Sequence, residues 1–258
     1  MSQPIPLAVQ LYSLRDAAAD DMPGVLEQVA RAGFLGVEYA SLHDQAPADV
    51  RRWASDVGLE GVGIHRRLPP GAEGERVLDE AAELGVGTVI VPWVEPARFA
   101  TDAAIATLAD ELSGAVALAA SRGVRLGYHN HEFEPAARGA GGMTGLERLF
   151  ELAGPDLLAE VDIYWATVGG EDPAALIRRL GSRVRLVHVK DGPADAADRD
   201  APQVAVGAGR VDIAGAVAAA SAAEWHVVEL DRCATDMVEA LRSSVRYLVG
   251  HGLSRARA

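Results

Sequence analysis

The sequence predicts an α/β protein folded as a single (β/α)8 barrel domain, a TIM barrel, over residues 1–258. Three observations favour this fold. Eight short apolar runs alternate with longer segments of helical period, several helical segments end in glycine, and the alternation continues along the chain without a linker. An open doubly wound sheet is the alternative. No predicted strand is followed by the G-x-G-x-x-G turn typical of a dinucleotide-binding sheet, so we favour the barrel.

The predicted strands are runs rich in Val, Ile, Leu and Tyr. In chain order they cover residues 7–13 (LAVQLYS), 35–40 (LGVEYA), 59–65 (LEGVGIH), 88–93 (TVIVPW), 124–131 (VRLGYHNH), 157–165 (LLAEVDIYW), 184–191 (VRLVHVKD) and 225–231 (WHVVELD). Each strand needs a neighbour to pair with and a helix to cover it. A closed parallel barrel provides both for all eight strands.

The predicted helices lie between these strands and have apolar residues at helical spacing. They include residues 22–33, 46–58, 74–85, 101–123 and 172–181. Each of these segments ends in a glycine, which suits the left-handed backbone position that closes a helix. The repeating unit is therefore strand, loop, helix and turn.

Composition and charge exclude several classes of function. The formal net charge is -13, so the chain lacks the excess of Lys and Arg that binding to nucleic acid or to an anionic membrane surface requires. The single cysteine, Cys233, cannot form an internal disulfide. The first residues do not read as a signal peptide, and no apolar run is long enough to span a bilayer. We expect a cytoplasmic protein.

Ionisable residues gather at the carboxyl ends of the predicted strands. They are Glu38, His65, His129, His131, Asp162, His188, Lys190, Asp191, Glu229 and Asp231. Because the active site of such a barrel forms at these ends, we expect these side chains to converge on one rim. Side chains alternate across a strand, so His129 shares a face with His131, and His188 shares one with Lys190.

Converging imidazoles and carboxylates suit a divalent cation. One histidine at a strand end is more often a hydrogen-bonded structural residue than a ligand. Four strands that each end in a metal-capable side chain make chance placement a poor explanation. Oxygen and nitrogen ligands favour Mn²⁺, Fe²⁺, Co²⁺, Zn²⁺ or Mg²⁺. The sequence therefore predicts one divalent metal ion, with its identity open.

Several segments together carry a resemblance to a known family. They are QLYSLRD, GFLGVEYA, GYHNHEFE, AEVDIYW, LVHVKDG, VGAGRVD and VVELD. This ordered set resembles the xylose-isomerase-like barrel superfamily, in its sugar phosphate isomerase/epimerase branch. The resemblance implies one metal that binds neighbouring oxygens of a sugar, held by His129, Asp162, His188 and Glu229. The ketose epimerases carry a glutamate where His129 stands, and His131 is the alternative ligand on that strand.

The variant HNHEFE is similar to the inosose dehydratase and keto-sugar lyase side of the superfamily. Trp165 stands where related enzymes carry a histidine, and it suits a wall that stacks on a sugar ring. The expected reaction removes a proton from the carbon beside a metal-bound ketone of a sugar or cyclitol. Glu229 and His131 are the candidate bases, and Lys190 is the candidate proton donor or oxyanion partner.

The remaining predicted contacts concern the substrate. Glu38 and His65 are expected to bind substrate hydroxyls, and the segment Val206–Asp212 could present Arg210 and backbone N–H groups to a phosphate. Isomerisation or epimerisation is the first hypothesis, with inosose dehydration or keto-glycoside lysis on the same site as its alternative. An apurinic endonuclease is less consistent with the acidic charge. A sugar- or metal-binding barrel without turnover is the alternative of another class. A homodimer is expected only from the fold class.

Overall fold

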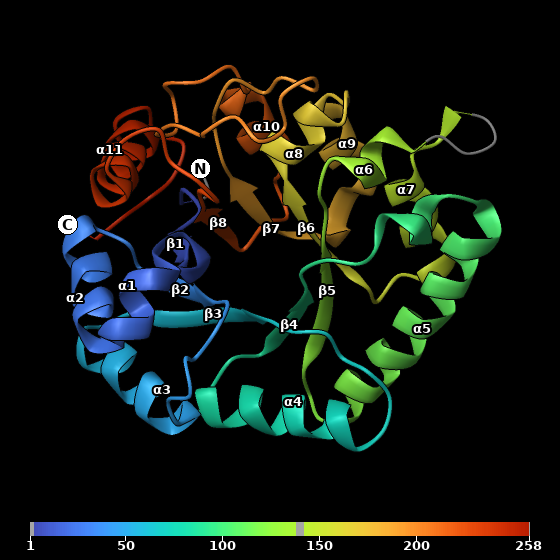
Figure 1. Ribbon diagram of the computed structural model, residues 1–258, viewed down its shortest axis with the longest axis horizontal. Helices are drawn as coiled ribbons and strands as arrows, with labels where there is room; N and C mark the ends of the chain where they lie inside the picture. The colour runs from blue at the N-terminus through green and yellow to red at the C-terminus, as the bar shows by residue number, and fades with distance from the viewer. Residues whose placement is uncertain (1–2, 138–141, 258) are drawn as a thin grey trace.

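A closed barrel of eight parallel strands, paired in chain order, forms the centre of the computed structural model, which describes residues 3–137 and 142–257 (Figure 1). The strands are β1 (Leu7–Gln10), β2 (Gly36–Tyr39), β3 (Glu60–His65), β4 (Thr88–Val91), β5 (Arg125–His129), β6 (Leu158–Asp162), β7 (Val184–Val189) and β8 (Trp225–Val228). The strand β8 pairs with β1, which closes the ring. The predicted barrel is confirmed.

Helices surround this ring. They are α1 (Arg15–Asp20), α2 (Met22–Ala32), α3 (Pro47–Asp56), α4 (Ala72–Leu84), α5 (Asp102–Ser121), α6 (Phe133–Ala136), α7 (Gly145–Ala153), α8 (Ile163–Val168), α9 (Pro173–Leu180), α10 (Ile213–Ala219) and α11 (Met237–Gly250), with short 3₁₀ turns η1 (Leu11–Leu14), η2 (Pro96–Phe99) and η4 (Gly181–Arg183). The helix α2 shows why they begin and end where they do. Asp21 accepts a hydrogen bond from the N–H of Gly24, and Gly33 at φ 103° closes the last turn.

Several strands end earlier than predicted, and polar side chains account for two of these ends. The predicted strand 157–165 was wrong beyond Asp162, because Asp162 Oδ1 accepts the N–H of Trp165 at 2.8 Å and starts α8. In the same way, Gln10 Oε1 accepts the N–H of Tyr12 at 3.1 Å, and η1 replaces the predicted continuation of β1. Both aromatic residues therefore lie on turns beyond the strands.

Two layers of side chains fill the barrel. The lower layer is apolar and consists of Ala8, Val62, Ile90, Leu186 and Val227, with Trp225 packed against it. Gln10, His188 and Glu229 stand two residues beyond Ala8, Leu186 and Val227 on the same faces. The apolar layer thus supports a polar layer from below. The register pairs Asp162 with His188, which sets both at one height.

One helix needs comment because of its composition. Among the described helices, α5 is the one that is long and apolar enough to cross a membrane by those two criteria. Figure 1 shows it in the outer ring of the barrel, and a core helix of a soluble protein can meet the same two criteria. The finding is weak support for a membrane span, and the predicted cytoplasmic location stays a prediction.

Candidate metal centre and active site

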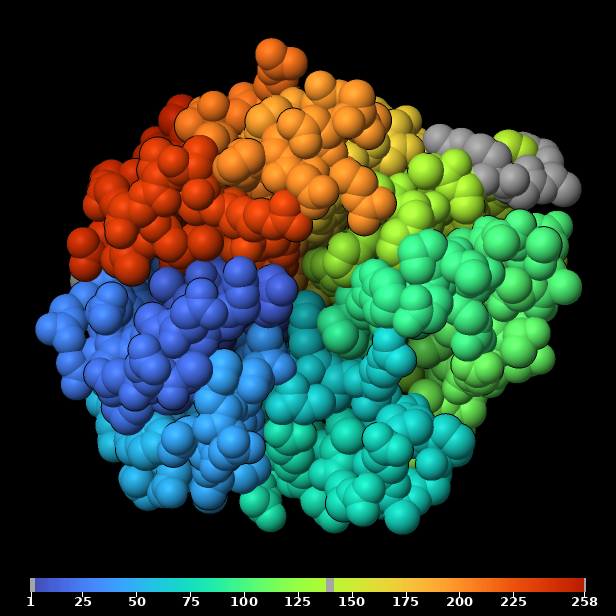
Figure 2. Space-filling model, in the orientation of Figure 1, coloured from blue at the N-terminus to red at the C-terminus, as the bar shows by residue number. Residues whose placement is uncertain are grey.

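A pocket of about 400 Å³ opens at the mouth of the barrel, and Figure 2 shows a hollow near the middle of this face. Its walls include Tyr12, Trp93 and Trp165, and Lys190 and Glu229 lie among its ionisable residues. Two larger hollows, of about 920 and about 720 Å³, lie among outer helices, and no histidine lines either of them. The chemistry-bearing residues therefore belong to the pocket at the mouth.

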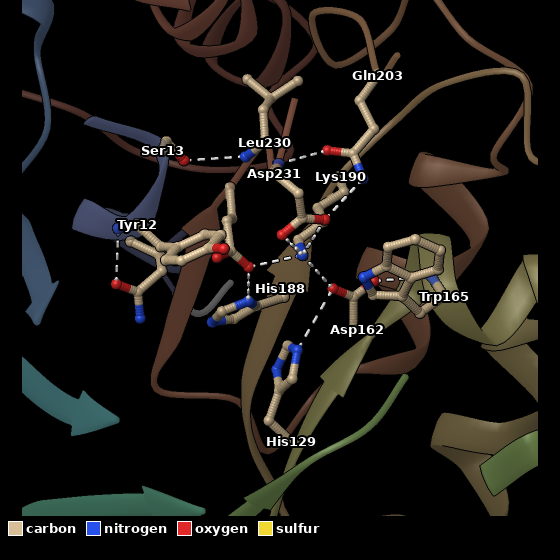
Figure 3. Close-up of polar contacts among 12 residues, drawn as sticks. Tyr12, Ser13, His129, Asp162, Trp165, His188, Lys190, Gln203, Leu230 and Asp231 are labelled. Carbon is tan, nitrogen blue, oxygen red and sulfur yellow. Dashed lines mark hydrogen bonds and ion pairs between the residues drawn. The ribbon is translucent and has the colours of Figure 1, made fainter. Parts of the chain in front are cut away.

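Four buried residues at this mouth bring ligand atoms together. His129, Asp162, His188 and Glu229 each offer one atom, and the four atoms lie within 4.8 Å of one another. His129 Nε2 is 3.7 Å from Asp162 Oδ2, and His188 Nδ1 is 2.9 Å from Glu229 Oε2. Figure 3 shows the side chains of His129, Asp162 and His188 turned toward one another. Two imidazoles and two carboxylates suit a borderline divalent cation, so the residues fit the implied metal.

Lys190 is buried between three carboxylates. Its Nζ lies 2.7 Å from Glu229 Oε2, 3.0 Å from Asp162 Oδ2 and 3.0 Å from Asp231 Oδ2. Burial alone would lower the pKa of Lys190, but these carboxylates outweigh it and raise the pKa well above the usual value. The ammonium therefore stays charged at neutral pH beside the pocket that it lines.

Negative charge still exceeds positive charge in the cluster, because two further buried carboxylates, Glu38 and Glu160, lie close by. Burial opposes protonation of the nearby imidazoles, but Glu38 and Glu160 outweigh it. The pKa of His65 rises to about 9, and that of His188 rises well above its usual value. Protonated imidazoles thus supply positive charge at the place where a divalent cation would supply it.

The two extra carboxylates orient the two histidines. Glu160 Oε2 lies 3.2 Å from His129 Nδ1, and Glu38 Oε2 lies 2.7 Å from His188 Nε2. In each ring the other nitrogen is the one that faces Asp162 or Glu229. A carboxylate behind a metal-binding imidazole sets its tautomer and orientation. Glu38 is itself held by Gln10 Nε2 at 2.8 Å.

A second combination of ligands overlaps the first. His65, His129, Glu160 and His188 also offer four atoms within 4.8 Å of one another. However, Glu160 Oε2 is already bonded to His65 Nε2 at 2.8 Å as well as to His129. We favour the first set, because its carboxylate Glu229 lines the pocket that a substrate would enter, whereas Glu160 of the second set is not among the described residues that line it.

Replacing Glu160 by glutamine is expected to weaken Zn²⁺ or Mn²⁺ binding about 10–100-fold, the usual cost of losing such a supporting carboxylate. The amide keeps the shape but no longer stabilises the correct form of His129. Competition with a chromophoric chelator measures the affinity. Glu80→Gln, at a partly buried glutamate paired with Arg66, is the matched control. Equal metal affinities of the two variants would mean that Glu160 does not support the metal centre.

His131 forms part of the pocket wall. Its ring stacks on Trp165 at a centroid distance of 6.0 Å, and its Nδ1 is buried with no hydrogen-bond partner among the described residues. Burial, followed by the charge of Lys190, lowers the pKa of His131 to about 4, so the ring is neutral at neutral pH. Glu134 Oε2 accepts the backbone N–H of His131 at 2.8 Å and fixes this turn.

The segment Val206–Asp212 does not present its backbone to the pocket. The N–H groups of Gly207, Gly209 and Val211 donate to the buried carboxylate of Asp191, at 2.9 to 3.1 Å. These donors are therefore occupied and cannot cradle a phosphate. The side chain of Arg210 is exposed and is not among the described residues that line the pocket, so its contact with substrate stays a prediction.

Comparison with known proteins gives a family. A family model for the xylose isomerase-like TIM barrel matches residues 26–248. The chain belongs to this family. Within it, the chain is 27% identical over 205 residues to an inosose dehydratase of Geobacillus kaustophilus, covering 67% of this chain and 65% of that protein. It is 32% identical over 194 residues to a 3-dehydroshikimate dehydratase of Pseudomonas aeruginosa, covering 69% of this chain and 30% of that protein.

A solved member of similar fold is a sugar phosphate isomerase/epimerase from Parabacteroides distasonis. It superposes with a TM-score of 0.81 at 22% identity, covering 98% of this chain and 96% of that one. This likeness shows the fold. The chain spans less than two thirds of the length of each of the two curated relatives.

Within this xylose isomerase-like barrel, the structure places most of the site residues predicted from the sequence at the pocket. It brings together the four predicted metal ligands, and it places His131, Lys190, His65 and Trp165 on the pocket. Glu38 lies fully buried beneath His188 and does not line the pocket, so its geometry favours orienting a ligand over touching substrate. Glu160 was missed, although it stands two residues before Asp162 on the same face of the strand.

Proposed function

We propose that this protein is a divalent-metal-dependent enzyme that removes a proton from the carbon beside a ketone of a sugar or cyclitol. One observation carries the proposal: four ligand atoms lie within 4.8 Å of one another. Two of the residues that supply them, His129 and Glu229, line a pocket of about 400 Å³. The pocket volume suits a small polar ring. The names of the curated relatives, which are dehydratases, agree with chemistry of this class.

His129, Asp162, His188 and Glu229 would hold the metal, whose chemistry is to polarise the ketone oxygen and stabilise negative charge that develops there. The protein's own groups then move the protons. His131 is neutral and lines the pocket, which suits a base that accepts the C–H proton. The Glu229 pKa is lowered, since the charges of Lys190 and His188 outweigh its burial. Its Oε2 is also held by His188 Nδ1 at 2.9 Å and Lys190 Nζ at 2.7 Å, whereas His131 Nδ1 has no hydrogen-bond partner among the described residues, so Glu229 is better suited to be a ligand than a base.

Dehydration is a second candidate outcome, favoured by the pairing of one base with one acid. His131 would take the proton, the electron pair would form a C=C bond, and the C–O bond at the next carbon would break. Lys190, charged and on the pocket, would donate a proton to the departing hydroxide to give water. In epimerisation or isomerisation, the same first step would be followed by return of the proton to the other face or to the neighbouring carbon.

The test separates proton removal from its outcome. A panel of keto-sugars and inososes is incubated with the protein in D₂O and followed by NMR for exchange of the C–H beside the ketone. We expect exchange that falls at least about 100-fold after removal of metal with EDTA and returns with Mn²⁺, Co²⁺, Zn²⁺, Fe²⁺ or Mg²⁺, because such a metal supplies several kcal/mol of stabilisation. An enone absorbance would identify dehydration. Binding without any exchange would instead support a sugar-binding barrel.

A further inference from the structure

Three arginines stand around the mouth of the pocket, although they are far apart in the sequence. Arg15 follows β1, Arg199 lies between β7 and α10, and Arg232 follows β8. Two of them are exposed and already paired. Arg199 Nη1 lies 2.7 Å from Glu132 Oε1, and Arg232 Nη1 lies 2.9 Å from Asp200 Oδ1.

Arg15 differs from the other two. It is half-buried, and its Nη1 donates to two backbone carbonyls, that of Tyr12 at 2.8 Å and that of Asp231 at 3.2 Å. Its guanidinium also lies over the ring of Tyr12, 4.3 Å from the centroid. Ser13 Oγ accepts the N–H of Leu230 at 2.9 Å, which joins the same two segments (Figure 3). The position of the guanidinium is thus fixed by its surroundings.

No carboxylate neutralises Arg15 among residues 3–137 and 142–257, and no hydrogen bond from its Nε or Nη2 occurs within them. Asp231 accepts from Arg15 through its backbone carbonyl only, and its side chain is engaged elsewhere. Its carboxylate accepts from Lys190 Nζ at 3.0 Å and from Gln203 Nε2 at 2.9 Å. Of the three arginines at the rim, Arg15 is thus the one without a paired carboxylate among the described residues.

We infer that Arg15, stacked on Tyr12, is the binding site for an anionic group on the substrate, either a carboxylate or a phosphate. A guanidinium presents parallel N–H groups that match two oxygens of such an anion, and the free edge of Arg15 provides them. Figure 3 shows Tyr12 and Trp165 on opposite sides of the metal-ligand cluster, and both line the same pocket as Arg15, so a substrate bound over the cluster would share this pocket with the guanidinium. The inference rests on the proposed function, because both concern the same pocket.

Calorimetric titration with three probes tests this site: D-glucuronate, inorganic phosphate and neutral D-glucose. The protein is used as purified and again after EDTA treatment, so that a bound metal cannot act as the anion site. We expect at least one anion to bind more tightly than glucose, and Arg15→Gln to weaken that anion about 10–100-fold while leaving glucose unchanged. Tighter phosphate binding would point to a phosphorylated substrate, and tighter glucuronate binding to a sugar acid.

The matched control is Arg52→Gln, which removes an arginine that lies over Trp53 on the outer helix α3. Arg15→Lys, which keeps the charge but loses the planar fork, should retain part of the affinity and guards against misfolding of Arg15→Gln. Equal anion affinity in wild type and both Arg15 variants, or no preference for either anion over glucose, would overturn the inference. Neither result depends on turnover, so failure here is distinct from failure of the proposed reaction.

Discussion

Asp162→Asn and His129→Ala proteins are each expected to lose the divalent metal, with affinity at least about 100-fold below wild type, beyond the usual effect of a supporting residue. Each change removes one of four atoms that lie within 4.8 Å of one another. Asparagine is chosen at 162 because its carbonyl can still accept the N–H of Trp165 and start α8. Mass spectrometry of the purified proteins, with one metal per chain expected for wild type, measures the loss.

His226→Ala is the matched control for this experiment. His226 is a buried histidine on β8, but it bonds to Ser254 Oγ at 2.8 Å, away from the cluster. The His226→Ala protein should keep its metal content. Any general effect of removing a buried histidine side chain would therefore be seen in this control. Full metal content in both Asp162→Asn and His129→Ala would mean that the cluster is a hydrogen-bonding network and that the proposed centre is wrong.

His131→Asn is expected to lower turnover about 10²–10⁴-fold while metal content stays at the wild-type level. The range is the usual contribution of a positioned general base. His131 is not one of the four proposed ligands, although its ring packs edge-on against that of His129 at a centroid distance of 5.1 Å, and asparagine can still complete the wall beside Trp165. Exchange of the substrate C–H in D₂O should fall with turnover, because proton removal itself is impaired.

Glu229→Gln provides the contrast, because Glu229 was the other candidate base. As a proposed ligand, it should lose metal affinity and activity together, and added metal should restore part of the activity. If His131→Asn kept near wild-type exchange while Glu229→Gln lost exchange with metal still bound, the roles of the two residues would be reversed. Thermal unfolding of both variants checks that neither loss comes from unfolding.

Local patterns in the sequence determined the barrel and the membership of its rim. Eight runs of the right length and the glycines that end the intervening helices predict a parallel barrel, because each strand can be buried only by its neighbours and a covering helix. The two-residue period of a strand predicts that His188 and Lys190 share a face, and both do reach the site. The ends of strands were less predictable, as the helical turn that begins at Ile163 shows.

What the sequence could not supply depends on contacts between segments far apart in the chain. The two-residue period of the strand predicts the face on which Glu160 lies, but not its role. That role depends on contacts with His65 and His129 from two other strands. The glycine-rich segment before Asp212 could bind a phosphate by its composition alone, whereas Asp191 occupies its N–H groups in the fold. Local propensity and periodicity are set within a few residues, so the sequence by itself determined the barrel and the residues that gather at its rim. Only the closed barrel decides which charged side chains meet. It also decides which of them are paired and which, like Arg15, have no carboxylate partner among the described residues.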